Sequence, residues 1–172
     1  MQTEEIENKI AQSGLVSIDL KDFYTPGKRI VIDMKEHLFQ GLILKEKDFR
    51  NFIRNEDWSK YKGKYVVITS TADAIIPTWA YMLITCELQA NAAMVICGNL
   101  EMLEAALFHN SFSEKLHPET YAGKRVMIKG CGDVKIPVSA FSEATAMLLP
   151  YAKSIMYGEA CSNVPIYKTK EI

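Results

Sequence analysis

The chain has 172 residues, of which 48% are hydrophobic and 24% are charged, and its net charge is −1. This size and composition are typical of a globular protein, and the near-neutral net charge with scattered lysine and arginine does not favour binding to nucleic acid or to an anionic membrane. The acidic start MQTEEIENKI is unlike a secretory signal, and no apolar run reaches the about 18 residues of a membrane span. The four cysteines show no CxxC spacing, so we expect a cytoplasmic protein with reduced thiols and neither a membrane nor a nucleic-acid partner.

The first sixty residues predict two helices and three strands. The apolar spacing indicates an amphipathic helix over 3–13, strands over 15–20 and 28–34, a weaker strand over 41–45, and a helix that begins at Glu46. A Thr-Pro-Gly turn separates the first two strands, and such turns join neighbouring strands. We therefore expect strands of hairpin type in this part of the chain.

From residue 61 onward, strands alternate with helices. The expected order is strand 65–69, a helix from Pro77, strand 93–97, helix 100–109, strand 125–129, a helix from Pro137, strand 153–157 and an extended tail. This alternation is typical of βαβ units in a parallel sheet.

Residues 61–98 match residues 121–158 without a gap when the chain is shifted by sixty positions, and thirteen of the 38 aligned pairs are identical. Both copies place a proline where a helix begins, which suits the first helical turn because the missing N–H costs nothing there. A glycine, Gly98 or Gly158, follows the second strand of each copy. The match predicts two repeated βαβ units.

We therefore predict a single α/β domain over residues 1–172 with a mixed, mainly parallel sheet. Its parts are an N-terminal region of helix, strands and helix (1–60), a first βαβ repeat (61–98), a connecting helix and loop (99–120), a second βαβ repeat (121–158) and an extended tail (159–172).

Ligands of parallel α/β sheets bind outside the carboxyl ends of the strands. Four loops are expected there along one edge of the sheet: 70–76, 98–101, 130–136 and 158–163. The candidate site residues lie in or beside these loops.

Asp73 and Asp133 occupy equivalent places, four residues before each helix-leading proline. They are candidate catalytic residues, as a pair of carboxylates for acid/base chemistry or ligand binding. The alternative, which the pattern favours, is that each carboxylate caps the entry of its own helix or forms an Asx-turn.

Cys131 and Cys161 follow the two strands of the second repeat, where neighbouring loops come close together. The flexible Gly130-Cys131-Gly132 segment before a helix favours a thiolate, so Cys131 is a candidate nucleophile, and both cysteines are candidate ligands of zinc or iron. The alternative is two unrelated buried thiols.

The remaining candidates are weaker. Gly130, Gly132, Glu159 and Trp79 are the candidate ligand-binding residues, although Trp79 also suits packing. We expect Cys86 and Cys97 in the core and the three histidines, His37, His109 and His117, as ordinary rather than metal-binding side chains. The common nucleotide, zinc-protease and serine-hydrolase motifs (GxxxxGK[ST], GxGxxG, HExxH and GxSxG) are absent from the sequence.

The segments GLILKEKDFRNFI, SKYKGKYVVITSTADAIIPTWAYML, VMIKGCGD and AKSIMYGEACSNVPIYK closely resemble an uncharacterised bacterial family, a domain of unknown function, over nearly the whole chain. The resemblance implies no activity, cofactor or catalytic residue. It does imply an association with iron–sulfur cluster assembly genes, which draws attention to Cys131 and Cys161 because soft metals prefer thiolates.

Three functional hypotheses follow. The first is an accessory or ligand-binding protein, with metal or iron–sulfur handling through the two cysteines as its role. The second is an enzyme that acts on a small anionic metabolite with Asp73 or Asp133 as acid/base. The third is a self-associating structural module, with a protein partner or a homodimer as the expected assembly.

Overall fold

The computed structural model describes residues 14–130, 132–159 and 162–169. The helix predicted over 3–13 and the two cysteines Cys131 and Cys161 lie outside these described residues.

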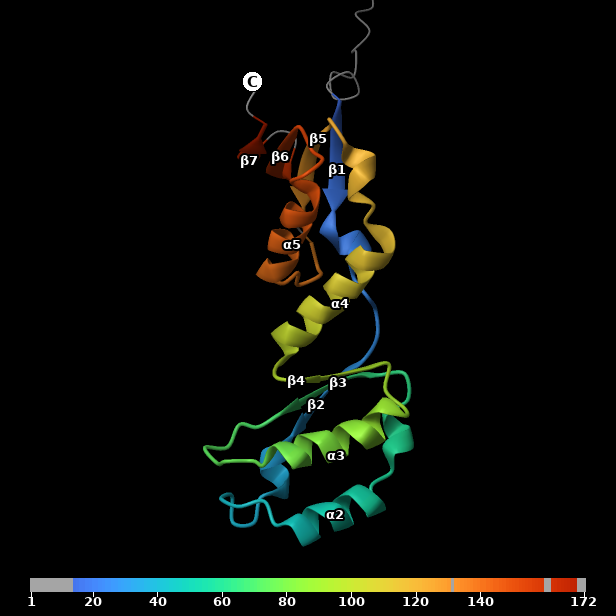
Figure 1. The fold of residues 1–172 in the computed structure, drawn as a ribbon, viewed down its shortest axis with the longest axis vertical. Coiled ribbons are helices and arrows are strands. Elements are labelled where there is room, and N and C mark those ends of the chain that lie inside the picture. The colour runs from blue at the N-terminus through green and yellow to red at the C-terminus, as the bar shows by residue number, and fades with distance from the viewer. Residues whose placement is uncertain (1–13, 131, 160–161, 170–172) are drawn as a thin grey trace, which may run out of the picture. The chain divides into compact units, whose positions relative to one another are not determined.

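The chain divides into two units. Unit 1 comprises Met1–Thr25 and Leu107–Ile172, and unit 2 comprises Pro26–Ala106. In the sequence, unit 2 is therefore inserted between the two segments of unit 1. Each unit has its own sheet, and Figure 1 labels the strands β1, β5, β6 and β7 of unit 1 and the strands β2, β3 and β4 of unit 2. The predicted α/β class with mainly parallel strands is confirmed, but the strands form two sheets instead of one. The boundaries of a single domain over 1–172 stay a prediction.

Unit 2 is built on a three-stranded parallel sheet in the order β2-β3-β4. Its strands are β2 (Arg29–Asp33), β3 (Tyr65–Thr69) and β4 (Met94–Cys97), and its helices α2 (Glu46–Asn55) and α3 (Thr78–Gln89) connect them.

Each helix of unit 2 buries one stripe of side chains in the core of the unit. In α3 the stripe is Ala80, Ile84 and Leu88, which recur every four residues, and in α2 it is Phe49 and Ile53. These side chains meet the inward residues of the strands in one core, as the helical period of the sequence predicts.

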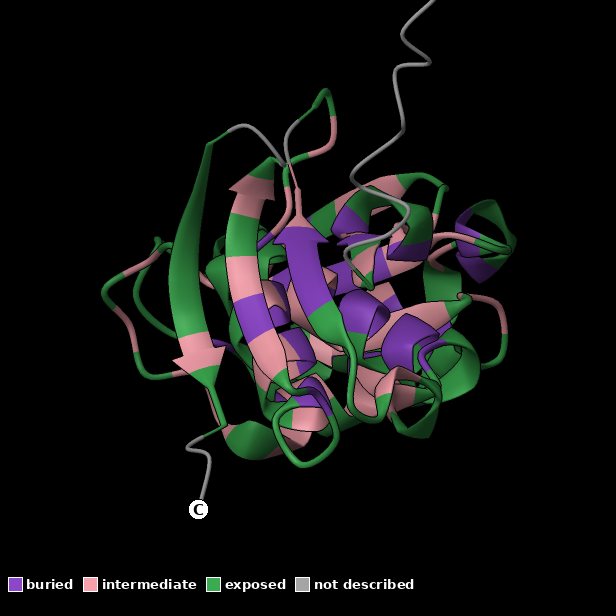
Figure 2. Ribbon diagram, turned by 90° about the horizontal axis from the view of Figure 1, so that it is seen from above, coloured by how far each residue is buried: buried purple, intermediate pink, exposed green. Residues whose placement is uncertain are grey.

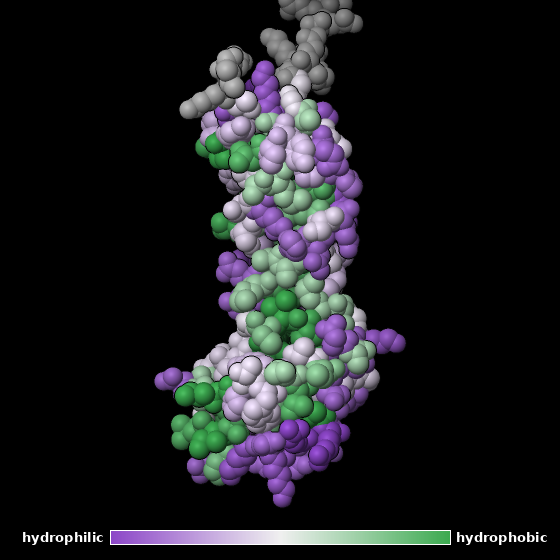
Figure 3. Space-filling view, viewed as in Figure 1, coloured by the Kyte–Doolittle hydropathy of each residue, from purple (hydrophilic) through white to green (hydrophobic). Residues whose placement is uncertain are grey.

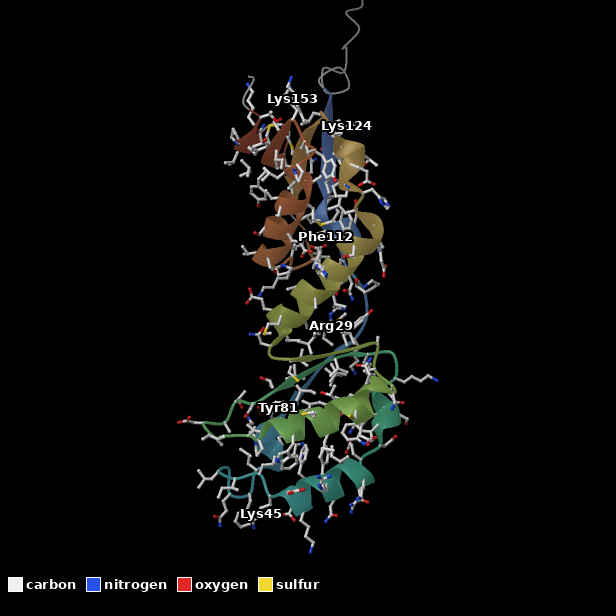
Figure 4. All side chains as sticks on the ribbon, in the orientation of Figure 1. Arg29, Lys45, Tyr81, Phe112, Lys124 and Lys153 are labelled. Carbon is white, nitrogen blue, oxygen red and sulfur yellow. The ribbon has the colours of Figure 1, made fainter. Side chains whose placement is uncertain are left out.

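Helix α4 (Leu100–Lys115) belongs to both units, because the boundary between them falls after Ala106. In unit 2, Glu104 of α4 accepts two hydrogen bonds from the Arg29 guanidinium, at 2.8 and 3.0 Å. This bidentate pair ties the first turns of α4 to the start of β2. Figure 4 labels Arg29 at this place.

Unit 1 has a four-stranded sheet in the order β1-β5-β6-β7, in which only β7 is antiparallel to its neighbour. Its strands are β1 (Leu15–Asp19), β5 (Arg125–Lys129), β6 (Ser154–Glu159) and β7 (Ser162–Lys168), and α5 (Val138–Leu148) connects β5 to β6. Burial falls from β5, whose middle three residues are buried, to β7, which is mostly exposed (Figure 2). The core between sheet and helices includes Phe108 and Phe112 of α4 and Ala144 of α5.

The two units share an order of strand, helix, strand, helix and strand and have corresponding strand registers, and unit 1 adds β7. Arg29 pairs with Tyr65 at the start of β2 and β3, as Leu15 pairs with Arg125 at the start of β1 and β5. The pairs Tyr65–Met94 and Arg125–Ser154 correspond across the shift of sixty residues. A 3-10 turn follows the first strand and another precedes the second strand in each unit, over Leu20–Phe23, Met34–His37, Trp58–Tyr61 and Pro118–Tyr121.

Several predicted details are wrong. The strands near the N-terminus form no hairpin, because β1 pairs in parallel with β5, and β2 pairs in parallel with β3. The weak strand expected over 41–45 is reduced to one bridge between Phe39 and Ile43. The helix expected over 100–109 continues to Lys115. Since β3 and β5 belong to different sheets, the four ligand-edge loops divide into two pairs, one in each unit, and do not share one edge of one sheet.

Candidate functional site

A pocket lies at the carboxyl end of β3 and β4 in unit 2 and has a volume of about 700 Å³. Its walls are the ends of the two strands and the first two turns of α3. The lining residues are Ile68, Thr69, Ser70, Thr78, Tyr81, Met82, Thr85, Cys97 and Gly98. We call this cavity the β3–β4 pocket; its place is the one that open α/β sheets use for ligands, and its size suits a small organic molecule.

The lining of the β3–β4 pocket is apolar with a few hydroxyl groups. No lysine, arginine, histidine, aspartate or glutamate is among its described lining residues. Thr85 donates its hydroxyl hydrogen bond to the backbone oxygen of Tyr81 (2.7 Å), which leaves Ser70 and Thr78 as the hydroxyls nearest the start of α3. Such a surface selects a ligand by shape and by single hydrogen bonds rather than by charge.

Tyr81 places its ring on the sheet side of α3, where Figure 4 labels it. Burial raises the pKa of its hydroxyl, and the charges of Cys97 and Asp33 raise it further. Tyr81 is therefore a neutral hydrogen-bonding group at physiological pH and not a base.

The carboxylate of Asp33 holds the loop that forms one wall of the pocket. Asp33 ends β2, and its oxygens accept hydrogen bonds from the Thr71 hydroxyl (2.6 Å) and the Thr71 N–H (3.1 Å). The Lys35 N–H also donates to it (3.0 Å), and the Lys35 ammonium lies 3.4 Å away. Burial raises the pKa of this carboxyl, but the bonds from Thr71 and Lys35 lower it more, to about 2. Asp33 is thus ionised and fully engaged, which suits a positioning role and not proton transfer.

Unit 1 has a groove at the corresponding place, with a volume of about 660 Å³. Six of its lining positions correspond to lining positions of the β3–β4 pocket across the shift of sixty residues: Ile128, Val138, Phe141, Ser142, Thr145 and Tyr157. Tyr157 and Phe141 pack edge to face with ring centres 5.7 Å apart, and Ile166 of β7 borders the groove. The unit 1 groove is therefore the more apolar of the two.

An exposed apolar rim also borders the carboxyl end of the unit 2 sheet. Leu42, Ile43 and Ile75 are exposed to 65%, 62% and 94%, and they come from the loops after β2 and β3. Figure 3 shows hydrophobic side chains gathered where these loops project. The rim adds apolar surface close to the ligand edge.

The two predicted carboxylates, Asp73 and Asp133, lie exposed in loops of different units. Neither lines the β3–β4 pocket or the unit 1 groove. Helices α3 and α5 begin at Pro77 and Pro137 without a side-chain cap, so the capping that the sequence favoured is not seen.

The other predicted site residues lie beside the strands of unit 1 and on α3. Gly130 contacts Phe141 and Ile136 so closely that a Cβ would collide with them, and Gly132 has a φ of +149°. Glu159 pairs with Lys129 at 2.7 Å. Trp79 packs against the unit 2 core, 5.9 Å from the Phe49 ring, and does not line the pocket. The candidate metal ligands Cys131 and Cys161 lie outside the described residues.

Two further expectations about cysteine are wrong, because Cys86 and Cys97 are both exposed. Cys86 is two residues beyond the buried Ile84 and so falls off the buried stripe of α3. Cys97 ends β4 and lines the β3–β4 pocket.

The three histidines make ordinary contacts. His37 stacks on the Phe52 ring with centres 3.9 Å apart, and burial lowers its pKa despite the neighbouring carboxylates. His109 lies 2.6 Å from Glu143, and His117 lies 3.7 Å from Glu119.

Sequence reasoning missed Asp33 and Thr71. The available signal was a second internal match, at a shift of fourteen residues, between SIDLKD and VIDMKE. In both copies the aspartate accepts a hydrogen bond from the N–H two residues later, from Lys21 to Asp19 and from Lys35 to Asp33. Asp33 also reaches a second loop through Thr71, and that contact spans 38 residues.

Within 14–130, 132–159 and 162–169, no group of three histidine, cysteine, aspartate or glutamate side chains could hold a metal ion. The same residues contain no helix long and apolar enough to cross a membrane.

Comparison with known proteins places the chain in one family. No curated protein and no solved structure matches it. The family described as "Protein of unknown function (DUF2480)" matches residues 4–169, which is nearly the whole chain. The chain belongs to the DUF2480 family.

Proposed function

We propose that this chain is a small-molecule-binding protein whose ligand occupies the β3–β4 pocket of unit 2. The observation that carries the proposal is the cavity of about 700 Å³ at the carboxyl ends of two parallel strands, with one wall loop held by Asp33. Ligand pockets of this size are normally preformed, apolar and furnished with a few polar groups.

The lining favours an uncharged ligand with an apolar body and one or two hydrogen-bonding groups. Ser70, Thr78 and Tyr81 supply hydroxyls, while Ile68 and Met82 supply apolar contact. A free anion would meet no cationic side chain among the lining residues. This argues for the binding hypothesis over the enzyme that uses Asp73 or Asp133 on an anionic metabolite.

A titration with the neutral dye Nile red tests the proposal. Unit 1 shows that the fold accepts larger side chains at these positions, since it holds Val138 and Tyr157 where unit 2 holds Thr78 and Cys97. Because a groove of about 660 Å³ remains beside Tyr157, Cys97→Tyr should narrow the pocket and weaken the saturable dye signal that depends on it, whereas Cys86→Tyr on the outer face of α3 should leave the signal unchanged.

The two exposed cysteines provide a second readout. Bound dye should slow the reaction of Cys97 with a thiol reagent and leave Cys86 unaffected. If Cys97→Tyr binds the dye as the unmodified chain does, and Cys97 gains no protection, the proposed ligand site is wrong.

A role in handling a metal or an iron–sulfur cluster stays a separate hypothesis, which is drawn from the sequence and depends on Cys131 and Cys161. Metal analysis of the untagged protein tests it, and a Cys131→Ser, Cys161→Ser variant with unchanged metal content would count against it. The cytoplasmic location likewise stays a prediction from the sequence.

A further inference from the structure

The outer edge of β4 lacks the residues that protect the other sheet edges. Among the described residues β4 pairs only with β3, and its sequence is Met-Val-Ile-Cys. The other three outer strands carry charge or proline: Asp19 in β1, Arg29 and Asp33 in β2, and Pro165 and Lys168 in β7. Proteins use charged residues and proline to prevent pairing at an edge, so β4 is the edge that is open to it.

Unit 1 shows what covers the corresponding edge. There β7 pairs antiparallel with β6 along nearly its whole length, from Ser154–Lys168 to Glu159–Ser162. Because β3–β4 and β5–β6 share one register, the free side of β4 corresponds to the side of β6 that β7 occupies. An antiparallel strand therefore fits this edge.

Backbone N–H groups of β4 point toward its free edge, where a further strand could accept their hydrogen bonds. The Ala93 N–H donates to the oxygen of Lys64, the residue before β3, at 2.9 Å. Alternation along a parallel strand then directs the N–H groups of Met94 and Ile96 away from β3 and toward the free edge.

Exposed apolar side chains lie near this edge. Met82, Leu100 and Met102 are exposed to 64%, 46% and 51%. Met82 lines the same pocket as Cys97, and the Met102 side chain lies against Gly98, which follows β4 directly. These side chains border the edge with surface that an interface would bury.

We propose that β4 pairs antiparallel with β4 of a second copy of this chain about a two-fold axis. The two three-stranded sheets would then form one sheet in the order β2-β3-β4-β4-β3-β2. A self-pair suits this strand because identical uncharged edges do not repel one another. The charged outer strand β2 then ends the sheet, so the assembly stops at two copies. The inference goes beyond ligand binding and does not depend on it.

Sedimentation velocity of the full chain at about 1–100 µM, concentrations that span the micromolar affinities of weak dimers, tests the inference. The expected mass is twice 19.4 kDa. Ile96→Lys and Ile96→Glu should each halve it, because a four-residue strand paired with itself brings the two like charges close together near the two-fold axis. An equimolar mixture of the two variants should restore the dimer, since opposite charges then meet.

Ile96→Thr is the matched control, because it keeps a β-branched side chain without charge and should stay dimeric. Rescue in the mixture separates loss of pairing from misfolding of either variant. A monomeric unmodified chain over the whole concentration range would overturn the proposal. So would charged variants that remain dimers, because the copies would then meet through another surface.

Discussion

Replacement of Asp33 by asparagine should destabilise unit 2 by about 2 kcal/mol at pH 7. The carboxyl pKa falls from 3.8 to about 2 in the folded chain, and that difference corresponds to about 2 kcal/mol of interaction with the ionised form. The side chain is only 14% exposed, so solvent screens this interaction less than it screens a surface pair. The asparagine side chain would keep one acceptor oxygen but lose the charge and the second oxygen that Thr71 and Lys35 contact.

The effect should also depend on pH with a defined sign. Because the folded pKa is the lower one, the stabilisation is fully present above about pH 4 and is lost as the pH falls toward about 2. The difference in unfolding free energy between the unmodified chain and Asp33→Asn should therefore be constant from pH 7 to about pH 5 and shrink below pH 4. Asp33→Asn should retain the pH dependence of every other group.

Urea unfolding followed by tryptophan fluorescence is the assay, because both tryptophans, Trp58 and Trp79, lie in unit 2. Asp57→Asn is the control in the same unit. Among the described residues, Asp57 accepts hydrogen bonds from Ser59, two residues away, and from no distant loop. Its replacement should therefore destabilise the chain much less than the replacement of Asp33. The reasoning about Asp33 is refuted if the two variants are equally destabilised at pH 7, or if the Asp33→Asn difference does not change below pH 4.

Three further outcomes are expected. Glu104→Gln should lower the unfolding free energy by about 1–2 kcal/mol in a denaturant titration, because Arg29 loses the carboxylate charge and one of its two acceptor oxygens. The control Glu101→Gln changes an exposed carboxylate and should cost almost nothing. The pKa of His37 measured by NMR should lie below 6.5. Protonation of His37 should therefore lower the stability of the folded chain as the pH falls below 6.5. An unshifted titration would contradict the burial of the ring. Gly98→Ala should destabilise unit 2 by more than about 1 kcal/mol, since the φ of +147° disfavours alanine and a Cβ would collide with Met102; equal stability on thermal unfolding would contradict this geometry.

The local pattern of the sequence sufficed for the strands and helices from residue 65 onward. Val66, Val67 and Ile68 form the short apolar run that is typical of a buried strand, and Ala80, Ile84 and Leu88 recur with the period of a helix, so the local pattern indicates the type of each element. The exposure of Cys86 also follows from that spacing, and the prediction of a buried thiol gave too much weight to residue type.

The pairing of the strands could not be predicted in the same way. Leu15–Asp19 and Arg29–Asp33 lie close together in the chain, which favours a hairpin, but they pair with strands 110 and 36 positions later. Alternation shows that a strand has one buried face and carries no information on which strand lies beside it. The division into two sheets, and with it the separation of the four loops, depends on these distant pairings.

The site was only partly predictable for the same reason. The rule for parallel sheets led to the loops after β3 and β4, where the β3–β4 pocket lies. It did not lead to Asp33, because the bond between Asp33 and Thr71 exists only once β2 and β3 are neighbours. The aspartates Asp73 and Asp133 drew attention through their identity at matched positions, yet they lie exposed outside both cavities.

The ligand pocket of unit 2 is tested most directly by amide chemical-shift mapping of the full chain with and without saturating Nile red. The expected shifts centre on Ser70, Thr78 and Thr85, with few changes along α5 in unit 1. Shifts that are confined to the groove around Phe141 and Ile166, or no saturable shifts at all, would contradict a binding site between β3, β4 and α3.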